Sequence, residues 1–284
     1  MQREMQINKT KIAELRKEYG DAFYLLDSGQ FRNNFIELKD TFRKIYPNFN
    51  IAYSYKTNYT PKFCKIVNEL GGYAEVVSEM ELEIALRVGV ESKRIIWNGP
   101  IKNAKKLEEF LVAGGTDNID SVEELAVVKA IAERHPDKVL NLGIRCNYDV
   151  QDGVVSRFGL DVDSEDFQQV LEFVITTKNV HFINFQCHFA KRQIEYWSAR
   201  AKGMVELIDR IGIIPERLDV GGGLFGKMAD SLKAQFKNDI PDYQAYAEAT
   251  ATIFADYFAD KNVKPELLIE PGSAVVGDCM KFVG

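Results

Sequence analysis

Four short segments of the sequence, each closing an apolar run, carry side chains that could do chemistry together. Lys56 lies in YSYKTN, His188 in QCHFAKR, Gly221 to Gly223 in LDVGGGLFG, and Glu270 in IEPGS. An amine can attack an aldehyde, an imidazole can stack on an aromatic ring, and a carboxylate can keep a pyridine nitrogen protonated. Consecutive glycines let backbone N–H groups approach a phosphate. These residue types together predict a site for pyridoxal 5′-phosphate (PLP).

Each of these residues also has an ordinary structural explanation. Lys56 could be a solvated lysine at the end of a strand, Glu270 a turn carboxylate before Pro271, and the glycines a flexible loop. His188 closes an apolar run, whereas the other two histidines precede a proline or open a run. The agreement of all these positions favours the cofactor site over the separate explanations. We expect partial burial to lower the pKa of Lys56 and so free its amine.

The elements that would position these residues are eight short apolar runs, rich in Ile, Val, Phe and Tyr, as buried parallel strands are. They span residues 51–55, 73–77, 94–97, 116–119, 139–146, 180–189, 217–220 and 267–269. Helix signals follow most of them, including the capping boxes Ser78–Glu81 and Ser121–Glu124. The repeated alternation predicts an α/β fold, a closed (β/α)8 TIM-like barrel, rather than an open doubly wound sheet.

In such a barrel the C-terminal ends of the strands line the active face. Asn98, Asp120, Glu75 and Arg145 are further polar residues at these ends. We interpret Glu75 and Arg145 as a possible ion pair that orders the pocket, or as a salt bridge without catalytic duty. Arg157, in the loop SRFGL, is a weaker candidate for contact with substrate.

The segments outside the barrel suggest a second domain. Residues 1–27 are predicted to form a helix over 12–19 and a strand over 22–27 that lead into the barrel, which would occupy residues 28–273. Residues 274–284 continue an apolar, strand-like run, AVVGDCMKFVG, with no helix after it. We expect them to begin a C-terminal β-domain that is truncated here, and this chain alone to have little or no activity.

Composition excludes several classes of protein. The chain has 284 residues, of which 46% are hydrophobic, and its net charge is −6 with no basic stripe, which argues against a nucleic-acid partner. No apolar run is long enough to cross a bilayer, and no signal peptide is evident. Four widely spaced cysteines without a C-x-x-C pair predict reduced thiols in a cytoplasmic protein and no metal site.

The chain resembles the barrel domain of the PLP-dependent decarboxylases of the alanine-racemase fold type, which include diaminopimelate, ornithine and arginine decarboxylases. YSYKTN, AEVVSEMEL, RFGL, QCHFA, LDVGGG and EPG are similar, in order, to six motifs of that family. The resemblance implies that Lys56 forms the Schiff base with PLP and that His188 stacks on its ring. It also implies that Gly221 to Gly223 contact its phosphate and that Glu270 pairs with its pyridine nitrogen.

Three positions depart from the family pattern. Glu75 stands where an aspartate is more usual, Ser273 follows EPG where an arginine that contacts phosphate is usual, and Ala190-Lys191 replaces a glycine-serine pair. We hypothesise that Lys191, or Arg192, restores the positive charge that Ser273 does not provide. A Lys191→Ala variant that holds PLP as tightly as the parent would refute this hypothesis.

The sequence therefore predicts a lyase that decarboxylates an amino acid with PLP through a Schiff base on Lys56. Its substrate would resemble diaminopimelate or ornithine, or be a specialised amino acid of secondary or siderophore metabolism, and the resemblance implies a homodimer. One alternative is an amino-acid racemase on the same fold, although such racemases usually place arginine, not a carboxylate such as Glu270, at the pyridine nitrogen. The other alternative is a non-catalytic PLP carrier or regulatory protein.

Overall fold

A closed barrel of parallel strands forms the centre of the computed structural model, which describes residues 8–236 and 240–284. The eight strands are β2 (Phe49–Ser54), β3 (Tyr73–Val76), β4 (Ile95–Trp97), β5 (Thr116–Ile119), β6 (Leu140–Asn147), β8 (Val180–Gln186), β9 (Arg217–Asp219) and β10 (Glu266–Ile269). Each pairs with the next, and β10 pairs with β2, which closes the ring. The predicted (β/α)8 barrel is confirmed. A short strand that the sequence did not predict, β7 (Leu160–Asp161), pairs with β6.

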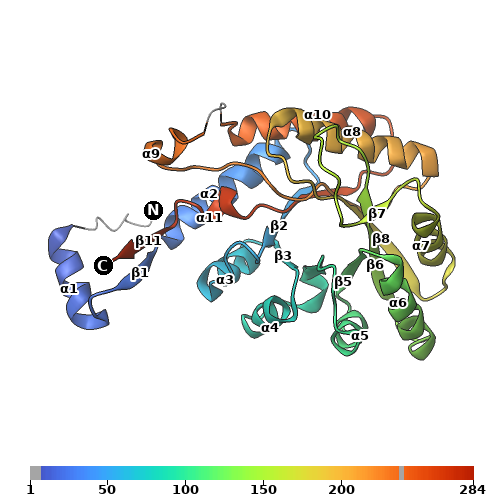
Figure 1. Ribbon diagram of the computed structural model, residues 1–284, viewed down its shortest axis with the longest axis horizontal. Helices are drawn as coiled ribbons and strands as arrows, with labels where there is room; N and C mark the ends of the chain where they lie inside the picture. Colours follow the sequence, from blue (N-terminus) through green and yellow to red (C-terminus); the bar gives the residue numbers. More distant parts are fainter. Residues whose placement is uncertain (1–7, 237–239) are drawn as a thin grey trace.

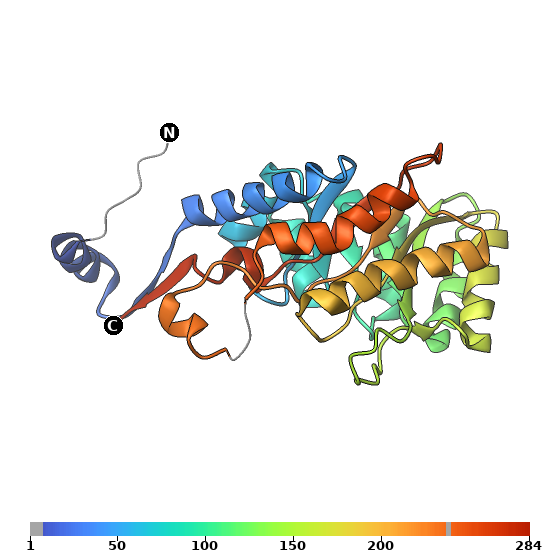
Figure 2. The ribbon, with the colours of Figure 1, turned by 90° about the horizontal axis from the view of Figure 1, so that it is seen from above.

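Helices surround the barrel on its outer face (Figure 1). They are α2 (Ser28–Arg43), α3 (Pro61–Glu69), α4 (Glu79–Arg87), α5 (Ala104–Val112), α6 (Val122–Arg134), α7 (Glu165–Thr176), α8 (Ile194–Ile211) and α10 (Tyr243–Tyr257). Two short helices, η1 (Ser92–Arg94) and α9 (Asp230–Lys233), lie in connecting segments. Helices α8 and α10 lie side by side (Figure 2), and α2 packs against α10 and α3 beside β2. Helix α2 thus covers the barrel although it precedes the first barrel strand.

Helix caps hold two of the strand–helix turns at the mouth of the barrel. The hydroxyls of Ser78 and Ser121 accept hydrogen bonds from the backbone N–H groups of Glu81 and Glu124. The side chain of Glu124 in turn accepts a hydrogen bond from the backbone N–H of Asp120, at 2.9 Å. These hydrogen bonds connect the strand end and the first turn of the helix. They therefore hold the residues that follow β3 and β5 close to the strand ends.

The barrel interior is largely polar, unlike the layer between strands and helices. Only Ala52, Tyr73, Ile96 and Leu268 form an apolar cluster separate from the main core, which lies outside the ring. Many other inward-facing positions carry buried amides and carboxylates. Buried polar groups are costly unless they are hydrogen-bonded, so this interior is built around polar contacts.

A two-stranded ribbon extends from the barrel beside the start of α2 (Figure 1). Strand β1 (Phe23–Leu26), preceded by α1 (Lys9–Tyr19), pairs antiparallel with β11 (Met280–Val283). The expectation of a continuous strand-like run after residue 273 is wrong in its first half, because Ser273–Val276 form a short helix, α11. All three apolar residues of α11 are buried, and α11 packs against α2, whereas a strand would turn alternate side chains outward.

Over the described part of the chain, none of the helices combines the length and the apolar composition that crossing a membrane would need. The same residues contain no group of three or more His, Cys, Asp or Glu side chains arranged to hold a metal ion. All four cysteines are buried and unpaired.

Candidate active site

Lys56 follows β2 and points its amine at a buried carboxylate. Its Nζ lies 2.8 and 3.0 Å from the two carboxylate oxygens of Glu75, at the end of β3, which also accepts a hydrogen bond from the hydroxyl of Ser54. Burial alone would lower the pKa of Lys56, but the negative charges of Glu75 and Glu270 outweigh it and raise that pKa above its ordinary value. The expected lowering of the Lys56 pKa is therefore wrong: the strand ends meet, and bring two carboxylates to the amine.

The proposed ion pair between Arg145 and Glu75 is also wrong. The Nη1 atom of Arg145 lies 2.7 Å from Oδ1 of Asp120, while Glu75 pairs with the lysine. Strand β6, which carries Arg145, is a neighbour of β5 and is separated from β3 by β4 and β5. Arg145 also lies over the ring of Phe158, which Arg157 flanks as well.

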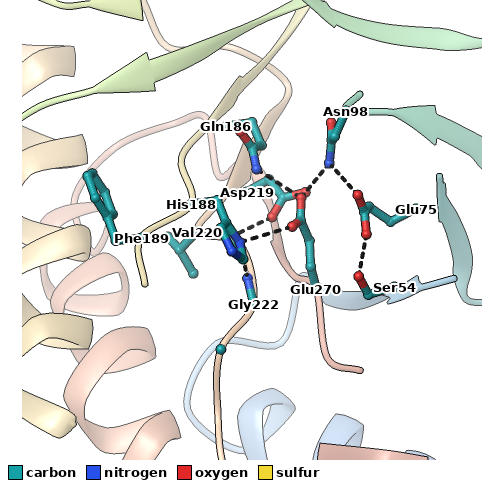
Figure 3. A network of polar contacts seen from close by, with 12 residues as sticks. Ser54, Glu75, Asn98, Gln186, His188, Phe189, Asp219, Val220, Gly222 and Glu270 are labelled. Atoms are coloured by element: carbon teal, nitrogen blue, oxygen red, sulfur yellow. Dashed lines mark hydrogen bonds and ion pairs between the residues drawn. The ribbon is translucent and has the colours of Figure 1, made fainter. Parts of the chain in front are cut away.

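Glu270, directly after β10, is buried and held by side-chain amides. Its Oε1 accepts hydrogen bonds from Asn98 at 2.5 Å and from Gln186 at 2.9 Å, and its Oε2 lies 3.6 Å from Nδ1 of His188 (Figure 3). Burial would raise the pKa of this carboxyl, but His188 and the charge of Lys56 outweigh it and lower the pKa to about 2. Glu270 is thus ionised at neutral pH.

His188, two residues beyond β8, is partly exposed and has one ring nitrogen engaged. The backbone N–H of Gly222 donates to Nδ1 at 3.1 Å. The same Nδ1 lies 3.6 Å from Oε2 of Glu270, so both neighbours meet one edge of the ring. The ring is therefore tied to the glycine loop by one edge and leaves its other nitrogen and its face for a ligand.

The glycine loop after β9 passes between the ends of β8 and β10, where only glycine fits. A Cβ on Gly221, whose φ is +74°, would lie 2.3 Å from the carbonyl oxygen of Cys187. A Cβ on Gly222 would lie equally close to the carbonyl oxygen of Glu270. The loop thus brings its backbone against the two strand ends that carry His188 and Glu270.

Amides inside the barrel extend this network in a way that the sequence analysis did not predict. Asn118 on β5 donates to Oδ1 of Asn98 at 2.6 Å, and Asn184 on β8 donates to Oδ1 of Asn118 at 3.0 Å. Together with the bond from Gln186 to Glu270, these bonds set the orientation of each amide, because its nitrogen donates and its oxygen accepts. The sequence pattern could have identified Asn118, Asn184 and Gln186. Each is a polar residue within an apolar run, at a position that strand alternation turns inward.

Asp219, at the end of β9, is a second buried carboxyl beside Glu270. Burial and the negative charge of Glu270 raise the pKa of Asp219 well above its ordinary value. Its Oδ1 accepts a hydrogen bond from the backbone N–H of Gly221 at 2.9 Å. Burial and the charge of Glu270 therefore favour the protonated form of Asp219, whereas His188 and Lys56 favour the ionised form of Glu270.

The chain matches the family of pyridoxal-dependent decarboxylases, and within it the pyridoxal binding domain, over residues 32–277. The chain belongs to this family. Diaminopimelate decarboxylase from Aquifex aeolicus is 27% identical over 97% of this chain, and that from Bacteroides thetaiotaomicron is 28% identical over 92%. The chain spans 64% and 68% of the lengths of these relatives.

Solved structures agree with the barrel of this pyridoxal-binding domain. The structure of diaminopimelate decarboxylase from M. jannaschii aligns with a TM-score of 0.81 and 25% identity, over 94% of this chain and 64% of that one. The fold is therefore the alanine-racemase type of (β/α)8 barrel that the resemblance implied.

The described residues fit the chemical groups of PLP. Lys56 offers an amine at the mouth, Glu270 an ionised carboxylate for a ring nitrogen, and the loop a backbone that no Cβ obstructs. Within residues 8–236 and 240–284, the backbone N–H of Gly223 donates to no protein group and can meet a phosphate.

Two predicted cofactor contacts lie outside the polar network. Ser273 is exposed and begins α11, next to Gly272, whose backbone packs against the side chain of Thr57. Lys191 contributes its backbone carbonyl, which accepts a hydrogen bond from Arg200. No hydrogen bond or ion pair joins either side chain to Glu270 or His188 in the described part of the chain.

Proposed function

We propose that this pyridoxal-binding domain belongs to an enzyme that removes the α-carboxylate of an amino acid as CO2. The observation that carries the proposal is Glu270, a buried carboxylate that stays ionised beside His188 and near Lys56. A racemase on this fold would need the ring nitrogen less strongly protonated, so the ionised carboxylate favours decarboxylation.

Glu270 would hold a proton at the ring nitrogen of the cofactor. Asn98 and Gln186 both donate to its Oε1, which leaves Oε2 as the oxygen with free lone pairs on the side of His188. When bound, PLP supplies an electron sink for the electron pair that remains on the substrate carbon after CO2 leaves.

Lys56 would bind the cofactor covalently through its amine. Because Glu75 raises the pKa of Lys56, the amine must first give up a proton, and Glu75 is the nearest acceptor, at 2.8 Å. When the amine of the substrate displaces Lys56 from the cofactor, the Lys56 amine would pair with Glu75 again. His188 would cover one face of the ring. The glycine loop Gly221 to Gly223 would bind the phosphate through the backbone N–H of Gly223, since those of Gly221 and Gly222 already donate to Asp219 and His188.

We propose a substrate that carries a second amino group, such as diaminopimelate or ornithine. The support is that the relatives described above are diaminopimelate decarboxylases. A panel of amino acids with and without a second amino group, assayed for CO2 release, tests this choice, and faster release from those without it would contradict the proposal.

Lys56→Ala tests the proposed cofactor attachment, with Lys62→Ala, an exposed lysine of α3, as the matched control. With added PLP, we expect a visible absorbance band in the parent and in Lys62→Ala and its loss in Lys56→Ala. Borohydride reduction followed by peptide mass mapping should place the label on Lys56. A label on another lysine, or none, would overturn the proposal.

We also propose that the active protein is a cytoplasmic homodimer in which residues 274–284 begin a second, β-rich domain. Four buried thiols without a disulfide support a reducing compartment. Among residues 8–236 and 240–284 no third strand pairs with the β1–β11 ribbon, which supports continuation of that sheet. Light scattering of the purified protein should give twice the mass of one chain, and a monomer with full activity would contradict this proposal.

A further inference from the structure

Helix α8 places a buried arginine against the two loops that carry His188 and the glycines. Arg200 is completely buried. Its guanidinium donates to the backbone carbonyls of Gly222 at 2.7 Å, Phe189 at 2.9 Å and Lys191 at 2.7 Å, and more weakly to that of Val220 at 3.4 Å. One side chain therefore joins the loop after β8 to the loop after β9.

The guanidinium of Arg200 forms no ion pair in the described part of the chain, and the charge of Glu270 offsets only part of the burial that lowers the pKa of Arg200. Every hydrogen-bond acceptor of its guanidinium is a backbone carbonyl, and its Nε, also buried, has none. Its remaining neighbours include the rings of Trp197, 4.6 Å from its Cζ, and Phe189. Buried charges in proteins are usually paired with an opposite charge, so this position favours an anion nearby.

The loop beside Arg200 presents donors that such an anion could use. Trp197 donates from Nε1 to the carbonyl of Gly223 at 3.3 Å, so α8 takes up the carbonyls of Val220, Gly222 and Gly223. The position of a Cβ on Gly223 lies 3.8 Å from Nη2 of Arg200. These carbonyl oxygens point toward α8, where Arg200 and Trp197 donate to them. The free N–H of Gly223 therefore lies on a loop whose partial negative charges are already compensated.

We propose that Arg200 and Trp197 are positioning residues for the phosphate of the cofactor. They hold the carbonyls of the glycine loop away from the ligand, and the buried charge of Arg200 favours a dianionic phosphate over a neutral group. This inference rests on the proposed function. It also assigns the positive charge near the phosphate to α8, rather than to the side chain of Lys191, whose carbonyl serves Arg200 instead.

The experiment compares the affinities of the protein for PLP and for pyridoxal, which lacks the phosphate. Arg200→Met should reduce the affinity for PLP by about 10- to 100-fold and change that for pyridoxal much less, so that the preference for PLP falls by about tenfold or more. Arg210→Met, an exposed arginine of the same helix that pairs with Asp163, is the matched control and should keep the parental preference. Lys191→Ala should also keep it.

The outcomes separate this inference from the proposed function. A parent protein that binds PLP only with Lys56 present, but whose preference survives Arg200→Met, overturns the inference alone. If Arg200 had a purely structural role, Arg200→Met would lower the affinities for PLP and for pyridoxal equally, and that result would also overturn the inference. If Arg200→Met does not fold, Trp197→Phe serves as the test, because it removes one hydrogen bond to the glycine loop. It should lower the preference for PLP over pyridoxal severalfold, and an unchanged preference would overturn the inference. A parent without Lys56-dependent binding contradicts the proposed function itself.

Discussion

Glu75 and Glu270, two buried carboxylates on the strands that flank β2, are bridged by one amide group. Nδ2 of Asn98 lies 2.5 Å from Oε1 of Glu270 and 3.4 Å from Oε1 of Glu75. Glu75 is compensated by the ammonium of Lys56, and Glu270 by the amides of Asn98 and Gln186. The lysine and its two carboxylates therefore form one electrostatic unit.

Glu270→Gln should lower the rate of decarboxylation more than it lowers the affinity for PLP. The amide cannot hold a proton at the ring nitrogen, so we expect the decarboxylation rate to fall by about 100-fold or more, the range typical of a lost electrostatic contact. PLP affinity, measured by titration of the absorbance band, should change less than tenfold because the phosphate and Lys56 contacts remain. Glu248→Gln, at an exposed position on α10, is the control. An equal loss of rate and affinity would contradict the assigned role.

Glu75→Gln should shift the pH dependence of PLP attachment to lower pH. Attachment needs the neutral amine, and Glu75 raises the pKa of Lys56. Removing that negative charge lowers the pKa, so the neutral amine becomes available at lower pH. Absorbance titration between pH 6 and 10 measures the midpoint for parent and variant. A midpoint that moves to higher pH in the variant would contradict the assigned effect of Glu75 on the pKa of Lys56.

Asp219→Asn should become more stable than the parent as pH rises. The pKa of Asp219 is raised in the folded state, so its contribution to stability is fully present below the unfolded pKa of about 4 and is lost as pH rises toward the folded pKa. Asparagine mimics the neutral carboxyl and does not titrate. Urea unfolding at pH 5, 7 and 8 should show a difference growing by at most about 1.4 kcal/mol per pH unit. Parallel pH profiles would mean that Asp219 is ionised in the folded protein.

Asn118→Ala should destabilise the barrel by about 2–4 kcal/mol. It removes the donor to Oδ1 of Asn98 and the acceptor of Nδ2 of Asn184, and so leaves one buried oxygen and one buried nitrogen without these partners. The free energy of unfolding in urea measures the loss. Asn103→Ala, which removes an exposed helix cap, should cost only about 1 kcal/mol. Equal costs for the two variants would show that the interior amide chain contributes little.

The eight strands could be predicted because each carries apolar residues on the face that the helices cover, even though many of the inward-facing positions are polar. Lys56, His188 and Glu270 could be placed at one face because the carboxyl ends of parallel strands meet there. The partner of Arg145 could not be predicted, since several strand ends carry carboxylates and only strand order places Asp120 beside it. The helix α11 was missed because three consecutive apolar residues suit a strand or a buried helix equally well.

By itself, the order of apolar runs, caps and glycines determined the barrel and the kinds of chemical group at its mouth, because these depend on local periodicity and backbone freedom. Only the tertiary structure decided the electrostatics of the site: it raises the pKa of Lys56, lowers that of Glu270, raises that of Asp219, and buries Arg200 behind the glycine loop. Protonation depends on burial and on neighbours within a few ångströms, and those neighbours come from strands far apart in the chain.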